Sequence, residues 1–305
     1  MARVAGIDCG TNSIRLLVAD IEDGVVRDVD RELRIVRLGQ GVDQTGRLAP
    51  EAIERTRVAL AEYAQIIADR GARKVRMVAT SATRDAANRD DFHDMVRATL
   101  GQSAEVITGP EEAALSYTGA IGALAGPADQ PHLVVDIGGG STEFIIGTAD
   151  RPGAARSVDI GCVRMTERHL RSDPPTAEQI AAARADIRAA IEEVRQDVPV
   201  QDARTLIGVA GTVTTVAAIA MELPAYQPDR IHGSTLSAAQ VHEVTTRLLA
   251  MPREERAALP VMHPGRVDVI GGGSLVLQTI VEQLQMPEVV VSEHDILDGI
   301  ALSIA

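Results

Sequence analysis

The sequence predicts an α/β protein made of two related halves, each with a mixed β-sheet flanked by helices. Three observations support this prediction. The chain has 305 residues, and a typical domain takes roughly 100–200. The pattern D-x-G-x-x-S occurs twice, at residues 8–13 and 136–141, a domain's length apart. Each copy lies between two apolar runs, as the tight turn of a β-hairpin does.

The first half opens with three strands. An apolar run from Arg3 reaches the first glycine turn, a second run covers Ser13 to Ile21, and the turn Asp23-Gly24 leads to a third strand that ends near Ile35. Glycine and aspartate favour tight turns, so these segments predict an antiparallel meander.

Helices and strands alternate after this meander. Pro50 favours the first turn of a helix, apolar residues then recur at helical spacing, and Gly71 ends the pattern. The later elements expected in this half are a buried strand at 74–79, a helix near 85–99 capped by residues 80–84, a short strand at 105–108 and a helix opened by Pro110. The order is therefore βββαβαβα.

The second half repeats the start of this order after a Gly126-Pro127 linker, which predicts domains at residues 1–125 and 126–305. Its expected elements are strands near 132–137, 141–148 and 154–160, a helix at 176–196, a strand at 205–209, a helix at 213–221, a helical stretch at 237–285, a strand at 289–292 and a final helix at 296–304. The final helix is amphipathic, and we expect it to pack back on the first domain.

Composition excludes several classes of protein. A net charge of −13 disfavours nucleic acid and anionic membrane surfaces as partners, and no apolar run reaches the roughly 20 residues of a membrane span. Lys74 is the only lysine and lies outside a GxxxxGK[ST] pattern, which excludes a P-loop. Cys9 and Cys162 form no CxxC pair, and we expect a cytoplasmic protein without a disulfide framework or zinc site.

The two glycine turns have the residue types of phosphate and metal sites. Asp8 and Asp136 end apolar strands, where ligands collect in α/β sheets, and their carboxylates suit magnesium. The loop glycines let backbone amides approach phosphate oxygens. The candidate phosphate-binding residues are Gly10, Thr11, Asn12 and Ser13 in the first turn and Gly138, Gly139, Gly140, Ser141 and Thr142 in the second. Ordinary hairpin turns are the alternative interpretation.

Further side chains carry candidate chemistry. Glu143, early in the strand after the second turn, can join Asp136 at a metal, and a solvent-facing glutamate is the alternative. Arg84 follows a buried strand, where a guanidinium can bridge phosphate oxygens or form a surface salt bridge. Glu111 and Glu112 lie in the first turn of a helix, which the helix dipole alone favours. Hydrolysis also needs a base to activate water, and this acidic pair can supply it.

Two more glycine-rich turns, Ala210-Gly211-Thr212 and Gly271 to Ser274, either touch a nucleotide or allow close helix packing. His294-Asp295 has the form of the start of a metal-binding HD motif. The other ligands of such a motif are missing, so we interpret this pair as incidental.

The combination of motifs resembles the exopolyphosphatase and guanosine-pentaphosphate phosphatase (Ppx/GppA) family, within the actin, sugar-kinase and Hsp70 superfamily. The matching segments span nearly the whole chain: GIDCGTNSIRLLVAD, ATSATRDAANRDDF, ITGPEEA, VVDIGGGSTEF, DIGCVRMTE, GVAGTVTT and DVIGGGSLVL. Each segment alone is unspecific, but the combination is highly specific.

The resemblance implies two actin-like (ribonuclease H-like) domains with a cleft between them, a divalent cation such as Mg²⁺, and a homodimer. The implied roles are a first phosphate loop at Asp8 and Gly10–Ser13, a phosphate-binding arginine at Arg84, a general base at Glu112, and magnesium ligands with a second phosphate loop at Asp136, Gly138–Thr142 and Glu143. Asp8 is a third candidate metal ligand.

The resemblance also implies an activity: metal-dependent release of orthophosphate from the end of inorganic polyphosphate. Longer family members carry C-terminal helical domains that have no counterpart in this sequence, so we expect a preference for short chains. Removal of the 5′-terminal phosphate of guanosine pentaphosphate (pppGpp) is the first alternative. An actin-like, nucleotide-dependent filament or regulatory ATPase and a sugar-type kinase are alternatives of other classes.

Overall fold

The computed structural model describes residues 2–124, 129–149 and 151–305. The chain divides into two compact units: the first comprises the chain up to Gly122 together with Asp295–Ala305, and the second comprises Ala123–His294. The last residues therefore belong to the first unit, where we expected the final helix to pack. The Gly126-Pro127 linker and the boundary predicted after residue 125 lie outside the described residues.

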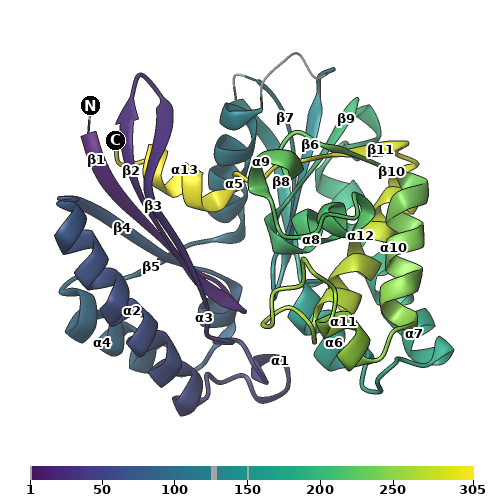
Figure 1. Ribbon diagram of the computed structural model, residues 1–305, viewed down its shortest axis with the longest axis horizontal. Coiled ribbons are helices and arrows are strands. Elements are labelled where there is room, and N and C mark those ends of the chain that lie inside the picture. The colour runs from purple at the N-terminus through teal and green to yellow at the C-terminus, as the bar shows by residue number, and fades with distance from the viewer. Residues whose placement is uncertain (1, 125–128, 150) are drawn as a thin grey trace. The chain divides into compact units, whose positions relative to one another are not determined.

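The first unit is built on a five-stranded mixed sheet (Figure 1). Its strands are β1 (Ala2–Cys9), β2 (Ser13–Glu22), β3 (Val25–Ile35), β4 (Lys74–Ala79) and β5 (Glu105–Val106), in the spatial order β3-β2-β1-β4-β5. The first three strands are antiparallel, whereas β1, β4 and β5 run parallel. The predicted meander is confirmed, and the carboxyl ends of β1, β4 and β5 lie along one edge of the sheet.

Helices cover both faces of this sheet. They are α1 (Val42–Thr45), α2 (Pro50–Arg70), α3 (Ser81–Asp85), α4 (Arg89–Leu100), α5 (Gly109–Ala123) and α13 (Ile296–Leu302). Successive side chains of a strand point to opposite faces. In β1, Ile7 and Cys9 join the core formed with α2 and α4, whereas Val4 packs with Leu297 of α13. Asp8 alternates with Ile7 and Cys9 and therefore lies on the α13 face.

The prediction of a helix near 85–99 is wrong at the start of that helix. The structure has α3 and α4 there, separated by an extended residue, Ala86. The N–H of Ala87 donates to the carbonyl of Gly46 at 2.9 Å. The side chain of Asn88 bonds to the N–H and the carbonyl of Leu48, at 2.8 and 3.1 Å. These partners are distant in the sequence, so local helix propensity did not reveal the break.

The second unit contains a six-stranded mixed sheet. Its strands are β6 (His132–Ile137), β7 (Thr142–Thr148), β8 (Arg151–Val158), β9 (Thr205–Val209), β10 (Thr235–Ser237) and β11 (Glu288–Val291), in the order β10-β11-β9-β6-β7-β8. As in the first unit, the first three strands are antiparallel, and the first of them runs parallel to its other neighbour, β9. The predicted repetition of the strand order is confirmed.

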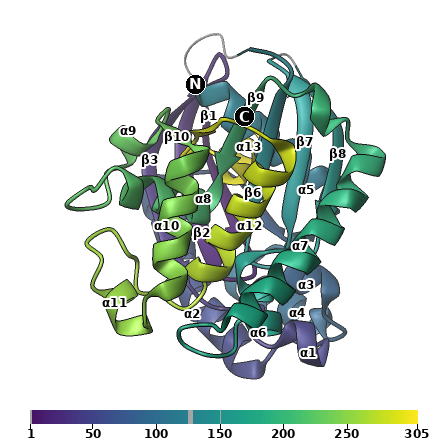
Figure 2. The same cartoon turned by 90° about the vertical axis from the view of Figure 1, so that its right-hand side faces the viewer.

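Most helices of the second unit pack in one layer over this sheet (Figure 2). They are α6 (Cys162–His169), α7 (Ala177–Asp197), α8 (Ala210–Ala220), α9 (Pro228–Ile231), α10 (Ala238–Ala250), α11 (Arg253–Ala257) and α12 (Ile270–Leu284), with a 3₁₀ turn at Val200–Asp202. Within the described part of the chain, no helix is both long and apolar enough to cross a bilayer.

The prediction of a turn at Gly271 to Ser274 is wrong, because this segment lies inside α12. A Cβ at Gly272 would come within 2.5 Å of Thr166 Oγ1 in α6, and one at Gly273 within 2.4 Å of Thr212 Oγ1 in α8. These glycines let α12 approach α6 and α8 closely. Of the two interpretations left open by the sequence, the contacts support close helix packing.

Glycines also join α5 to α13 within the first unit. A Cβ at Gly119 of α5 would lie 1.8 Å from the carbonyl oxygen of Asp295, and one at Gly299 of α13 would lie 2.0 Å from that of Leu115. The backbones of the two helices are therefore in direct contact. This contact helps to fix α13 on the face of the sheet that carries Asp8.

We expect Gly119→Ala to lower the free energy of unfolding by about 1–3 kcal/mol, because the methyl group has no room beside the backbone at Asp295. Gly122→Ala on the same helix is the matched control. A Cβ there meets no described atom within 4 Å outside its own helix and neighbours, and replacing a helical glycine stabilises by up to about 1 kcal/mol. Urea unfolding measures both; equal stability of the two variants would contradict the close contact.

Candidate active site

The two glycine turns close with the same backbone hydrogen bond. In the first turn the N–H of Gly10 donates to the carbonyl of Ser13 at 2.9 Å, and in the second the N–H of Gly138 donates to that of Ser141 at 3.1 Å. The first bond joins the ends of β1 and β2, and the second those of β6 and β7. The duplicated sequence pattern is therefore a duplicated local structure.

The segment after β3 supports the first turn from one side. The carbonyl of Thr11 accepts from the N–H of Gly39 at 2.8 Å, and that of Asn12 accepts from the N–H groups of Val36 and Arg37 at 3.1 and 2.9 Å. A trans peptide points its N–H opposite to its carbonyl. The N–H groups that follow these carbonyls therefore point away from the support, as an anion-binding turn requires.

The second turn is supported in the same way by the start of α6. The carbonyls of the loop glycines accept as follows: Gly138 from Cys162 N–H at 2.9 Å, Gly139 from Val163 and Arg164 N–H at 2.9 and 3.2 Å, and Gly140 from Gly161 N–H at 3.3 Å and Arg164 Nε at 2.7 Å. A Cβ at Gly161 would lie 2.3 Å from the carbonyl group of Gly139. The start of α6 therefore fits the loop only with glycine at position 161.

Hairpin register decides which residue faces each leading aspartate. Asp8 lies opposite Arg15 across β1 and β2, and Asp136 lies opposite Glu143 across β6 and β7. Directly opposed residues share a face of the sheet, with Cβ atoms about 4.5–5.5 Å apart. The first turn thus pairs a carboxylate with a cation, and the second pairs two carboxylates.

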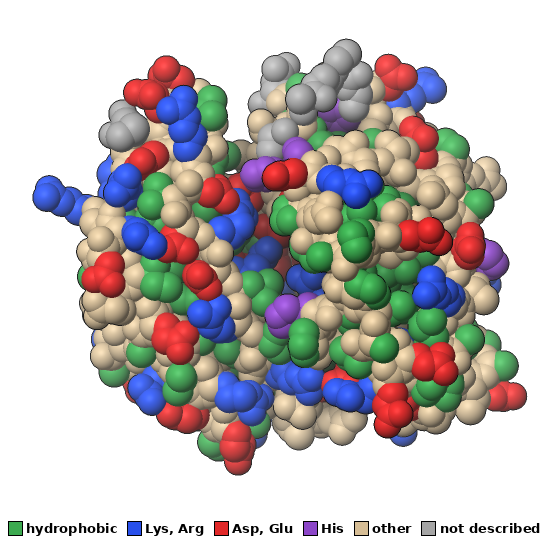
Figure 3. Space-filling view, viewed as in Figure 1, with side chains coloured by type: hydrophobic (Ala, Val, Ile, Leu, Met, Phe, Trp, Pro, Cys, Tyr) green, Lys and Arg blue, Asp and Glu red, His purple; other side chains and the backbone are tan. Residues whose placement is uncertain are grey.

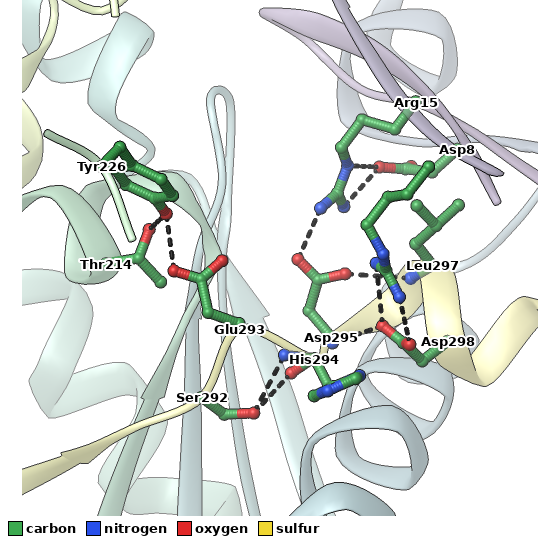
Figure 4. A network of polar contacts seen from close by, with 11 residues as sticks. Asp8, Arg15, Thr214, Tyr226, Ser292, Glu293, His294, Asp295, Leu297 and Asp298 are labelled. Carbon is green, nitrogen blue, oxygen red and sulfur yellow. Dashed lines mark hydrogen bonds and ion pairs between the residues drawn. The ribbon is translucent and has the colours of Figure 1, made fainter. Parts of the chain in front are cut away.

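The Asp8 carboxylate is buried and bonded to Arg15 (Figure 4). Both Nε and Nη2 of Arg15 donate to Oδ2 of Asp8, at 3.0 and 2.7 Å. Burial raises the pKa of Asp8, and the guanidinium of Arg15 opposes that rise. Asp8 is therefore held in one orientation at the base of the first turn.

Asp136 and Glu143 fit a divalent cation. Both are buried, with 6% and 1% of their surface exposed, and Ser157 Oγ in β8 donates to Glu143 Oε1 at 2.7 Å. Opposed like charges repel, and Mg²⁺ is usually bound by one or two carboxylates together with water and substrate phosphates. Among the described residues, no group of three or more His, Cys, Asp or Glu side chains could hold a metal ion. Asp136 and Glu143 match the one or two carboxylates that usually bind Mg²⁺.

Arg84 and Glu112 form an ion pair at the carboxyl edge of the first sheet. Arg84 Nη1 donates to Glu112 Oε2 and to the carbonyl of Ile107, both at 3.0 Å. Arg84 follows β4 and Glu112 follows β5, and these strands run parallel with β1, which leads into the first turn. The structure therefore brings three sequence-predicted groups, the first phosphate loop, the arginine and the base, to one edge of the sheet.

The structure distinguishes the two glutamates at the start of α5. The Glu112 side chain is 10% exposed and bonds to Arg84. The Glu111 side chain is 45% exposed and bonds to Arg76 at 2.8 Å. Glu112, and not Glu111, is therefore the glutamate that pairs with Arg84.

The hydroxyl groups of the turns have structural partners as well. Thr11 Oγ1 lies 2.9 Å from Ser81 Oγ, which joins the first turn to α3. Thr142 Oγ1 donates to the carbonyl of Ile160 at 3.1 Å. Ser141 is buried, whereas Asn12 and Ser13 are partly exposed. The phosphate contacts of these side chains stay predictions.

Sequence reasoning missed Arg15, Arg164 and Asp295. A signal for Arg15 was present, because closing the hairpin at residues 10–13 places Arg15 opposite Asp8. Arg164 and Asp295 bond to groups that no local pattern connects to them. Asp295 bonds to Arg15 at 2.5 Å, while its neighbour His294 packs edge-on against His232, with ring centroids 4.9 Å apart.

We expect Gly161→Ala to weaken binding of orthophosphate by roughly 10- to 100-fold, because its methyl group displaces the second loop and a shift of about 1 Å can have that effect. Gly271→Ala is the control, since the nearest atom to its Cβ is Leu249 Cδ2 at 3.4 Å, an ordinary contact. Isothermal titration with orthophosphate in the presence of Mg²⁺ measures the affinity. Unchanged affinity in Gly161→Ala would show that the loop does not depend on this support.

Comparisons with known proteins identify the family of this chain. The model of the Ppx/GppA phosphatase family matches residues 17–305. Exopolyphosphatase 2 of Mycobacterium tuberculosis is 54% identical over 318 aligned positions, which cover 100% of this chain and 99% of that protein. The guanosine-5′-triphosphate,3′-diphosphate pyrophosphatase of Aeromonas salmonicida is 31% identical, over 97% of this chain and 58% of its own.

A solved structure has the same fold as this chain. The crystal structure of an exopolyphosphatase-like protein superimposes with a TM-score of 0.96 at 45% identity, covering 99% of this chain and 97% of that one. The predicted fold class is therefore confirmed. With a family match over nearly its whole length and a relative at 54% identity, this chain belongs to the Ppx/GppA phosphatase family.

Proposed function

We propose that this protein is an exopolyphosphatase, which hydrolyses the terminal phosphate of inorganic polyphosphate and releases orthophosphate. The observation that carries the proposal is the Arg84–Glu112 pair, 3.0 Å apart beside the first phosphate loop. The pair combines a carboxylate that can take a proton from water with a guanidinium that can bind phosphate. The substrate class is supported by the relative named exopolyphosphatase that is 54% identical over 99% of its own length.

Glu112 is the general base of the proposed reaction. A water oxygen attacks the terminal phosphorus, the bond from phosphorus to the bridging oxygen of the chain breaks, and the carboxylate of Glu112 takes the proton of the water. The hydrogen bond from Arg84 fixes the orientation of this carboxylate. The products are orthophosphate and a chain shorter by one unit.

Arg84 and the loop amides stabilise the charge on the phosphoryl oxygens. Phosphoryl transfer depends mainly on positioning and on electrostatic stabilisation. Arg84 bonds to Glu112 and Ile107 through Nη1. A guanidinium has five N–H donors, so the other donors of Arg84 can reach a phosphate.

Basic and acidic side chains are mixed on the face of the molecule shown in Figure 3, and the net charge is −13. A polyanionic substrate therefore depends on local groups of this kind.

Asp136 and Glu143 would hold Mg²⁺ or another divalent cation, with Asp8 as a third candidate. Such a cation, when bound, neutralises charge on phosphate oxygens. Arg15 bonds to Oδ2 of Asp8, so Oδ1 is the atom that would face a cation or its water.

Hydrolysis of pppGpp is the second candidate function, since it uses the same groups. It is favoured by the 31% identity to the pyrophosphatase of Aeromonas salmonicida. Turnover of short polyphosphate and of pppGpp at equal concentrations separates the two: faster release from polyphosphate supports the first proposal, and faster release from pppGpp supports the second. Assembly into sedimenting filaments with ATP would instead support the actin-like alternative.

A preference for short chains, a cytoplasmic location and a homodimeric state complete the proposal. The cytoplasmic location is supported by the two free cysteines, Cys9 and Cys162, which are both buried. Burial raises the pKa of Cys162 to about 11, so this thiol is unreactive at neutral pH. Sedimentation equilibrium measures the oligomeric state.

We expect Glu112→Gln to lower kcat for orthophosphate release by about 10²- to 10⁴-fold, because an amide of the same size does not accept the proton. Glu111→Gln is the matched control, since Glu111 is exposed and bonds to Arg76. The assay measures orthophosphate from polyphosphates of defined length. Near-wild-type release by Glu112→Gln, or an equal loss in Glu111→Gln, would overturn the assignment of the base.

Removal of divalent cations with EDTA should abolish release, and Mg²⁺ should restore it. Glu143→Gln should lose most of the thermal stabilisation that Mg²⁺ gives the wild type, because stabilisation by a ligand depends on its affinity. Without Mg²⁺ this variant should melt no lower than the wild type, since glutamine removes a like-charge repulsion and still accepts from Ser157. Glu193→Gln, at an exposed ion pair, is the control. An unchanged Mg²⁺ shift in Glu143→Gln would contradict the metal site.

A further inference from the structure

Asp295 has two roles at the start of the last helix. Its Oδ1 accepts from the N–H of Leu297 at 3.0 Å and caps α13. Its Oδ2 accepts from Arg15 Nη1 at 2.5 Å. The side chain is 4% exposed, so both bonds are shielded from water.

Arg15 connects Asp295 to the first phosphate loop (Figure 4). One guanidinium group donates through Nε and Nη2 to Asp8 and through Nη1 to Asp295. A planar guanidinium held at both ends cannot rotate without breaking one of the bonds. The orientation of Asp8 is therefore coupled to the position of Asp295.

Asp295 is also the first residue of the chain after it leaves the second unit. The residues just before it are anchored in that unit. Glu293 Oε1 accepts from the hydroxyl of Tyr226 at 2.6 Å, and Ser292 Oγ donates to the carbonyl of His294 at 2.8 Å. Glu293 is thus bonded within the second unit, and Asp295 within the first.

A purely structural role for the Arg15–Asp295 bond is the competing explanation. A second ion pair already attaches α13 to the sheet: Arg31 Nη2 of β3 donates to Asp298 Oδ1 at 2.6 Å. These two attachments differ in one respect. Arg31 bonds to Asp28 and Asp298, whereas Arg15 bonds to the aspartate that leads the phosphate loop. Burying two carboxylates, Asp8 and Asp295, beside the single cation Arg15 is also costly in free energy. The attachment of a helix does not require such an arrangement.

We propose that Asp295 is a positioning residue for phosphate release, acting through Arg15 to hold Asp8 in its orientation at the first phosphate loop. The inference rests on the proposed function for its consequence in catalysis, but its structural part can be tested without catalysis. It also explains why the helix cap at position 295 is an aspartate, since asparagine and serine cap helices equally well.

The test uses Asp295→Asn and Asp295→Ser in the full chain. Both residues keep a good helix cap, but asparagine removes the charge opposite Arg15 and serine is too short to reach it. We expect kcat for orthophosphate release to fall about 10- to 100-fold, as when a group that orients an active-site ligand is removed. Hydrogen exchange of the amides of residues 10–13 should become at least severalfold faster.

Arg31→Gln is the matched control, because it removes the other attachment of α13 and touches no loop residue. It should lower the unfolding midpoint in urea and leave both kcat and the exchange of residues 10–13 within about twofold of the wild type. Equal effects of Arg31→Gln and the Asp295 variants on the loop would overturn the inference in favour of a structural attachment. Wild-type exchange and kcat in both Asp295 variants would also overturn it.

The failure of this inference is distinguishable from failure of the proposed function. If the wild type releases no orthophosphate from polyphosphate or pppGpp, the proposed function fails. Hydrogen exchange in the Asp295 variants then still tests whether Asp295 is coupled to residues 10–13, because exchange is measured on the protein without substrate. Faster exchange of residues 10–13 would support the coupling, and unchanged exchange would overturn it.

Discussion

The register of the two turn-closing hairpins is the constraint on which the candidate site depends. A single bond, from glycine N–H to serine carbonyl, closes each turn. Once it forms, the residue opposite the leading aspartate is determined, because antiparallel strands pair residue by residue. A shift by one residue would move Asp8 to the face that packs on α2 and α4, or Asp136 to the face of Val135 and Ile137. The turn glycines Gly10 and Gly138 therefore help to set the register that places the carboxylates.

The two hairpins differ in the residue that lies opposite the leading aspartate. With Arg15 opposite, Asp8 has its charge compensated inside the first unit. With Glu143 opposite, Asp136 belongs to a buried pair of carboxylates, the groups that bind Mg²⁺ in proteins. The duplicated turn thus places a carboxylate paired with a cation at one loop and two opposed carboxylates at the other. This difference follows from electrostatics and needs no difference in backbone structure.

Prediction from the sequence succeeded where the signal is local. Turn residues and strand alternation located both hairpins, and Pro50 and Gly71 located the long helix α2. It failed where distant residues decide the structure. Asn88, in the break between α3 and α4, bonds to Leu48, and the glycines of α12 are required by α6 and α8 rather than by a turn. Glu111 and Glu112 are equivalent in local pattern, and their different partners come from tertiary structure.

The helix α13 completes the first unit, although it follows the second unit in the sequence. The face of the first sheet that carries Val4 and Asp8 is covered by α13, through a contact with α5 that leaves no room for a side chain at Gly119. Because Asp8 and Arg15 lie on this face, the same helix that buries them also supplies Asp295 as their third partner. Contacts between residues so far apart in the sequence carry a large loop-closure entropy. The surroundings of Asp8 therefore depend on residues that lie before and after the second unit in the sequence, Arg15 and Asp295.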